Sequence, residues 1–156
     1  MQKLKCNIVI IFFALAYSLN LVCQVKNDSL ELQSFWKSHI HPIINGEKEK
    51  VEKNTHFPLE GDWGYMMELE KSDAEWKKED FIRNYEKLFT QELVDSLQSS
   101  DYKDIEIIFH KDGDMELLVS VNFMKWIDDF KDEYGIIFRF KVIENSWKLY
   151  LIQGVG

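Results

Sequence analysis

The chain has 156 residues and a formal charge of −8, with 46% hydrophobic residues, 14% aromatic residues, 7 glycines and 2 prolines. This composition excludes a collagen, a mucin-like stalk and a proline-rich linker, and it disfavours disorder over the whole chain. The length is typical of one domain with a packed core, and such a core absorbs the aromatic side chains without any binding site.

The first 23 residues have the order of a secretory signal peptide. Lys3 and Lys5 precede an apolar stretch over residues 8–19, and a short segment then leads to Cys23. An apolar run of about a dozen residues is too short to span a bilayer, which takes about 20. We therefore predict cleavage between Cys23 and Gln24, export to the periplasm or the extracellular space, and no integral membrane span.

A second interpretation makes Cys23 the lipid-modified first residue of a lipoprotein anchored to the envelope. The segment ending at Cys23 matches a lipobox only in part, because Val22 stands where Gly, Ala or Ser is usual. Both interpretations place the protein outside the cytoplasm, and both stay open.

Removing 23 of the 156 residues leaves 133, which we assign to a single domain over residues 24–156 with its core at about 29–153. The signal takes two lysines and no acid with it, so the formal charge becomes −10. This acidic balance disfavours nucleic acid as a partner. Because the mature chain keeps at most Cys23, it has no disulfide, as suits a bacterial envelope protein.

Helical periodicity begins the mature chain. Apolar residues at 3–4 spacing predict a helix over 29–44, in which Pro42 should cause a kink or an end near Ile40. A short charged helix over 47–55 follows, anchored by Val51, and Phe57-Pro58-Leu59 ends it.

Alternation then predicts a strand over 63–70. A helical region starts at Ser72 or Asp73, and a further short helix covers about 90–98. The core face of the first of these helices is expected to consist of Phe81, Ile82, Tyr85, Leu88 and Phe89.

After residue 104, apolar and polar residues alternate again, which predicts an antiparallel meander of four strands. Strands over 105–109 and 115–123 flank an Asp-Gly turn at 111–114, a looser acidic connection covers 125–133, and strands over 138–142 and 147–151 flank a turn at 144–146. The inward positions are expected to include Phe109 and Phe123. The fold class is therefore α+β, with N-terminal helices packed on a curved antiparallel sheet of about four to five strands.

Three motifs in this order carry a resemblance to a known family. They are Phe35-Trp36 followed by Gly46-Glu47, Val51 and Phe57-Pro58-Leu59; the helix Phe81–Phe89; and the closing strand Trp147–Tyr150. Together they resemble the nuclear transport factor 2-like superfamily, a cone-shaped fold also described as cystatin-like, over about residues 30–153. The resemblance implies a curved sheet around a long helix, a conical pocket and frequent dimerisation through the sheet. Its members include isomerases, dehydratases and binding modules, so the fold leaves the function open.

An isomerase-like member would need a carboxylate base and an oxyanion donor in the pocket. Asp62 and Tyr65 are the nearest candidates, but period-two geometry puts them on opposite faces of a strand. We therefore predict no catalytic residues. His39 and His41 point in different directions on a helix, without a carboxylate at the spacing of a helical metal pair, so we predict no metal and no cofactor.

Aromatic residues give the candidate ligand contacts, although each also fits a packed core. The candidates that line the cone pocket in this interpretation are Trp36, His39, Trp63, Tyr85, Trp126 and Trp147. Trp126 differs from the others because its predicted position is a loop between strands, where it either caps the pocket or packs on the sheet edge.

The outward face of the sheet is expected to hold a mixture of charged and apolar residues that is solvated or dimerising. Its members are Glu106, Ile108, Glu116, Leu118, Ser120, Arg139, Lys141 and Tyr150, and acidic and basic positions on neighbouring strands could pair. The leading hypothesis is an exported, non-enzymatic domain that binds a small apolar ligand or a protein partner in the envelope. The alternatives are an isomerase- or dehydratase-like enzyme using the cone pocket, and a structural or dimerisation module whose cone is filled.

Overall fold

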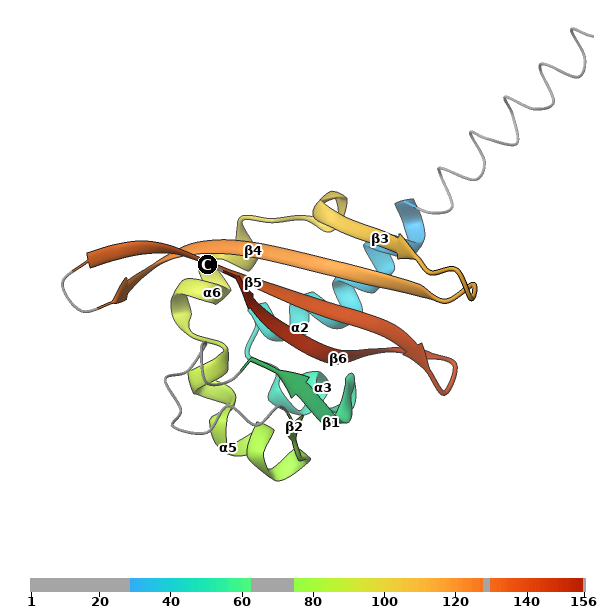
Figure 1. The fold of residues 1–156 in the computed structure, drawn as a ribbon, viewed down its shortest axis with the longest axis horizontal. Helices are drawn as coiled ribbons and strands as arrows, with labels where there is room; N and C mark the ends of the chain where they lie inside the picture. The colour runs from blue at the N-terminus through green and yellow to red at the C-terminus, as the bar shows by residue number, and fades with distance from the viewer. Residues whose placement is uncertain (1–28, 63–74, 128–129, 156) are drawn as a thin grey trace, which may run out of the picture. The chain divides into compact units, whose positions relative to one another are not determined.

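The computed structural model describes residues 29–62, 75–127 and 130–155, and for residues 123–127 and 130–132 it describes the backbone alone. Residues Phe35–Gly156 form one compact unit (Figure 1). Its helices are η1 (Trp36–Ile40), α2 (His41–Ile44), α3 (Lys48–Lys53), α5 (Lys78–Leu88), α6 (Gln91–Gln98) and η2 (Tyr102–Asp104). Its strands are β1 (Thr55–Gly61), β2 (Glu75–Trp76), β3 (Ile105–Phe109), β4 (Met115–Ile127), β5 (Phe130–Ile143) and β6 (Ser146–Val155).

The strands form one sheet in the order β2-β1-β6-β5-β4-β3. Strands β3 to β6 are the predicted antiparallel meander, β1 joins β6 in parallel, and β2 pairs antiparallel with β1. The predicted α+β class is confirmed, and the sheet has six strands rather than four or five. The strand β1 was not expected, whereas the predicted strand over 63–70 lies outside the described residues.

The opening helix passes through its proline instead of ending near Ile40. Residues 29–35 are α-helical, η1 is a π-helical turn, and α2 continues to Ile44. Pro42 has no N–H to give to the carbonyl of Ser38, four residues earlier. The side-chain Nδ2 of Asn54 donates to that carbonyl over 2.7 Å instead. The π turn and this side chain therefore let the helix continue without leaving the carbonyl of Ser38 unpaired.

The second helical region is shorter than predicted. Residues 75–76 form β2, and α5 begins at Lys78 rather than at Ser72 or Asp73. Ile82, which was predicted to face the core, is 37% exposed. A residue one position after the buried Phe81 points about 100° away from it on a helix, so the apolar face consists of residues 81, 85 and 88.

The predicted loose connection over 125–133 is wrong. Strand β4 continues to Ile127 and β5 begins at Phe130, with Trp126 opposite Lys131 in the register. The two turns are confirmed: Gly113 has φ +95° in the Asp-Gly turn, and Glu144 and Asn145 both have positive φ between β5 and β6. Phe109, predicted to face inward, is 75% exposed because β3 is the edge strand and Phe109 is its last residue.

The core lies between the described helices and one face of the sheet. The ring of Phe35, directly before η1, packs edge to face on Phe140 of β5 at 4.9 Å, and α6 packs on β4. The largest side chains with almost no exposure are Phe81, Phe138, Phe140, Ile40, Ile43, Leu59, Leu93, Leu97, Leu149 and Ile152. Each contributes on the order of 1.5–3 kcal/mol by burial. Helices on one face of a curved, mainly antiparallel sheet are the arrangement that the nuclear transport factor 2-like resemblance implies.

Candidate functional site

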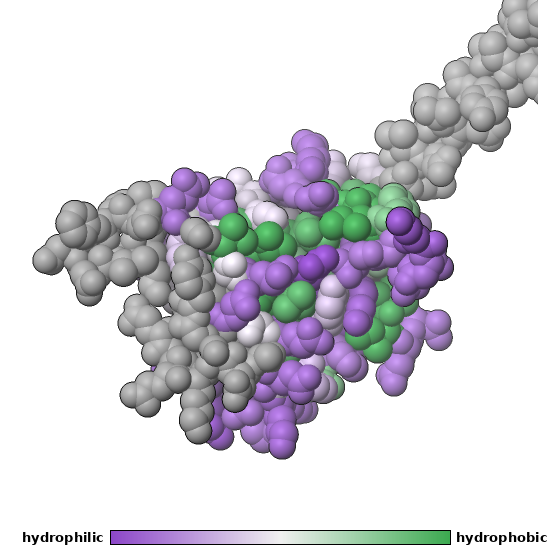
Figure 2. Space-filling model, viewed as in Figure 1, coloured by the Kyte–Doolittle hydropathy of each residue, from purple (hydrophilic) through white to green (hydrophobic). Residues whose placement is uncertain are grey.

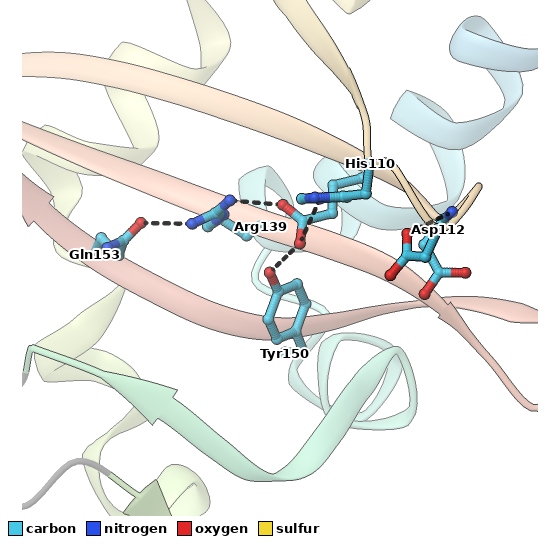
Figure 3. Close-up of polar contacts among 7 residues, drawn as sticks. His110, Asp112, Arg139, Tyr150 and Gln153 are labelled. Atoms are coloured by element: carbon cyan, nitrogen blue, oxygen red, sulfur yellow. Dashed lines mark hydrogen bonds and ion pairs between the residues drawn. The ribbon is translucent and has the colours of Figure 1, made fainter.

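Arg139 and Tyr150 lie on the face of the sheet opposite these helices (Figure 3), and both belong to a polar network centred on Glu116. Tyr150 Oη donates a hydrogen bond of 2.6 Å to Glu116 Oε1, and Arg139 Nη2 donates one of 2.6 Å to Oε2. His110 Nε2 lies 3.3 Å from Oε1. Arg139 Nη1 also donates to the side chain of Gln153 over 3.3 Å. Residues from β4, β5 and β6 and the residue directly after β3 therefore converge on one carboxylate.

The register of the sheet builds this network. Leu118 lies opposite Arg139, which places Arg139 diagonally across from Glu116. Strand β6 has one extra residue here, because Arg139 pairs with Leu151 while the next residue of β5 pairs with Leu149. Leu149 and Ile152 are both buried in the core, so the two residues between them face the open side, and this bulge aims Tyr150 at Glu116.

The surroundings of this carboxylate fix its charge. Desolvation raises the pKa of Glu116, but the hydrogen bonds from Tyr150 and Arg139 and the charge of Arg139 outweigh it and hold the pKa below its ordinary value. Desolvation, followed by the bond to Glu116, raises the pKa of Tyr150 to about 12. An efficient acid or base has a pKa near the working pH. Neither pKa lies near neutral pH, so at neutral pH Glu116 is ionised and the Tyr150 hydroxyl keeps its proton.

A cavity of about 430 Å³ opens beside the network. Its lining includes His110, Glu116, Lys141 and Val142, together with the turn residues Asp112 and Asp114. The side chain of Lys141 reaches over the Tyr150 ring, with Nζ 4.1 Å from its centroid. Although carboxylates and a histidine meet here, the residues that the structure describes contain no group of three or more His, Cys, Asp or Glu side chains able to hold a metal ion.

The open face also exposes apolar side chains between polar ones, as Figure 2 shows. Leu118 is only 8% exposed although it lies on this face, and Ile108, Ile137 and Leu151 are half-buried. Outward Glu106 and Glu116 lie on β3 and β4, whereas the outward basic residues Arg139 and Lys141 lie on β5. The face is therefore mixed in polarity, with two acidic strands beside a basic one.

Two of the predicted pocket residues meet on the inner face of the sheet. His39 Nε2 lies 3.1 Å from the carbonyl oxygen of Trp147, and its Nδ1 lies 3.2 Å from the carbonyl of Phe35. The His39 ring stacks on Phe35 at 4.5 Å, and Trp147 packs edge-on against Phe35 at 5.8 Å. Burial lowers the pKa of His39, with a smaller contribution from the charge of Lys148. These side chains fill the space between η1 and the sheet.

The other predicted pocket residues lie apart from this pair. Trp36 is buried on η1, and Tyr85 is buried on α5 among the rings of Phe81 and Phe89. Trp63 lies outside the described residues, and of Trp126 only the backbone, within β4, is described.

The hydroxyl of Tyr85 is a buried polar group without a hydrogen-bond partner among the described residues. The residue is 3% exposed, and desolvation, with a smaller effect of the Glu86 charge, raises its pKa to about 12. A buried hydroxyl left unpaired costs on the order of 1–3 kcal/mol.

The sequence had indicated part of this picture. Charged positions on neighbouring strands were expected to pair on the outward face, and Glu116 with Arg139 does so. The role of His110 was missed, although the Asp-Gly turn fixes the register and returns the chain toward Glu116 directly after His110.

No described helix is both long and apolar enough to cross a membrane.

Comparisons with known proteins found a similarity in structure but none in sequence. No family model matches this chain, and no curated protein matches it. Among solved structures, the chain is similar to a designed nuclear transport factor 2-like protein, at 10% sequence identity and a TM-score of 0.43. The similarity covers 83% of this chain and 99% of that one.

Proposed function

We propose that the mature chain is an exported, non-enzymatic binding domain of the cell envelope, and that the open face of its sheet docks protein. The observation that carries this proposal is the preformed Glu116 network on a face that no described helix of residues 35–156 covers. Side chains held by two short charge-assisted bonds lose little freedom on binding, which lowers the cost of association.

The occupant that the charges favour is a second copy of this chain. A half-turn about an axis parallel to the strands lays β4 of one copy over β5 of the other, as in an isologous dimer. Glu116 lies opposite Lys141 in the register, so each Glu116 would meet the Lys141 of the other copy. The apolar side chains between these charges supply the dry part of such an interface.

The oligomeric state in solution tests this proposal. Sedimentation equilibrium of residues 24–156 should give a dimer, and Lys141→Glu should give a monomer, because it puts two like charges at each contact. The matched control is Lys87→Glu, the same charge change at an exposed position of α5 away from the sheet. A wild-type monomer, or a Lys141→Glu dimer as stable as the control, would overturn the assignment of the occupant. A heterologous envelope protein recovered with the wild type but not with Lys141→Glu would then be the docked partner.

A second candidate function is the binding of a small, mainly apolar ligand inside the domain. The unpaired Tyr85 hydroxyl favours it, since a ligand with one polar group would satisfy that atom. Native mass spectrometry of protein extracted from its own envelope should then show a bound mass that Tyr85→Phe loses. If the extracted protein carries no bound mass, this candidate is eliminated, and the docking function is unaffected.

Export itself is part of the proposal and has its own readout. The mass of the mature N-terminus distinguishes cleavage after Cys23 from lipidation of Cys23. Membrane association that disappears in Cys23→Ser would establish the lipid anchor in place of free secretion.

A further inference from the structure

A second cavity, of about 510 Å³, lies where η1, α2 and α3 meet, away from the open face of the sheet. Its rim carries the cationic side chains Lys37, Lys50 and Lys53, with a single acid, Glu47. In a chain with 27 acidic and 19 basic residues, this is a local reversal of the overall charge. Glu47 forms an ion pair with Lys50, so the charges of Lys37 and Lys53 remain uncompensated by the acid of the rim.

The bond that replaces the missing donor of Pro42 lies in the wall of this cavity, because Ser38 and Asn54 both line it. Asn54 Nδ2 donates to the carbonyl of Ser38 over 2.7 Å and so ties the end of α3 to η1. Lys37 directly precedes Ser38, and Lys53 directly precedes Asn54, so this bond also fixes the separation of the two lysine backbones. A second bond, from Lys148 Nζ to the carbonyl of Lys53 over 2.6 Å, ties the same end of α3 to β6. These two bonds therefore hold the backbones of Lys37 and Lys53 at a fixed separation.

The chemistry of the rim selects the class of ligand. Ammonium groups on separate elements act as point charges from different directions, which suits a tetrahedral phosphate better than a planar carboxylate, for which the fork of arginine is the match. The exposed side chains of His41 and Asn45 add hydrogen-bonding groups to the rim. The cavity is larger than one phosphate needs, which leaves room for the group that the phosphate esterifies.

We infer that the cavity between η1, α2 and α3 binds a phosphate group, contributed either by a lipid headgroup or by a soluble phosphate ester. This site is independent of the docking face, because it shares no lining residue with the cavity beside Glu116.

Titration of ¹⁵N-labelled residues 24–156 with inorganic phosphate tests the site. The amide signals of Lys37, Lys50 and Lys53 should shift and saturate. The double variant Lys37→Gln, Lys53→Gln should bind about tenfold more weakly, the order expected when charge-assisted hydrogen bonds are lost. The matched control Lys87→Gln, Lys111→Gln makes the same charge change at exposed positions elsewhere and should keep the wild-type affinity. Asn54→Ala keeps every charge and should also weaken binding, because it removes the hydrogen bond that ties the end of α3 to η1.

Vesicles separate the two sources of phosphate. Binding to vesicles of phosphatidylglycerol in phosphatidylcholine, but not to phosphatidylcholine alone, with loss in the Lys37→Gln, Lys53→Gln variant, assigns the site to a headgroup. Saturable phosphate binding without vesicle binding assigns it to a soluble ester. Shifts that never saturate, or an equal loss in the site variant and its control, would overturn the inference.

Discussion

Tyr150 Oη donates a 2.6 Å hydrogen bond to Glu116 Oε1, joining β6 to β4 across the open face of the sheet over the intervening strand β5. Arg139 on β5 bonds to the other oxygen of the same carboxylate. One ionised side chain thus links three strands on the face to which we assign binding, while the packed aromatic core lies on the other face.

The inner face should dominate the stability of the fold. Phe140→Ala removes a ring that is 1% exposed, so the free energy of unfolding in urea should fall by about 3–5 kcal/mol. Phe109→Ala removes the same ring at a position that is 75% exposed and should change it by no more than about 0.5 kcal/mol. Equal losses in the two variants would contradict this assignment of the core.

Two tyrosine hydroxyls should respond to deletion with opposite signs. Tyr85→Phe removes an unpaired buried hydroxyl and should raise the free energy of unfolding of ligand-free protein by about 1 kcal/mol. Tyr150→Phe removes a hydrogen bond to a carboxylate and should lower it by about 1 kcal/mol. Urea unfolding measures both, and a destabilised Tyr85→Phe protein would show that its hydroxyl is paired.

His39 should make stability depend on pH below 6.5. Burial keeps its imidazole neutral and lowers its pKa from 6.5 in the folded state, so the unfolded chain binds the proton more readily. The free energy of unfolding should therefore fall as the pH drops below 6.5 toward the folded-state pKa. His39→Gln should lose less stability over this interval, and a slope identical to that of the wild type would contradict the burial of a neutral ring.

Glu116 should act over a lower pH interval. Its folded-state pKa is depressed below 4.5, so its contribution is fully present above 4.5 and is lost as the pH falls through the folded-state pKa. Glu116→Gln should cost about 1.5–3 kcal/mol at neutral pH and should flatten the acid limb of the stability profile. Glu106→Gln, at an exposed position of β3, is the control that should keep the wild-type acid limb.

Alternation and turn chemistry made the meander predictable. Each strand from β3 to β6 has a core face that alternates along the sequence, and the Asp-Gly and Glu-Asn turns set the register. The failures occur where tertiary contacts override local pattern. The opening helix continues past Pro42 because Asn54, distant in sequence, supplies the missing donor. Strand β1 forms around Phe57-Pro58 because β6 offers it a parallel partner.

The candidate site was only partly accessible to sequence reasoning for a similar reason. Alternation places Glu116 and Arg139 on the outward face, but the bulge at Tyr150 depends on the pairing of β5 with β6. Likewise, nothing in the local sequence shows that the end of α3 folds back on η1, so the lysine-rimmed cavity could not be predicted.

Complementation between two charge variants tests the docking face most directly. Glu116→Lys and Lys141→Glu should each be monomeric by analytical ultracentrifugation, with melting curves that confirm folding. In an equimolar mixture, every contact again joins a carboxylate to an ammonium group, so a heterodimer should form. A mixture of two folded variants that stays monomeric would contradict docking of a second copy through this face.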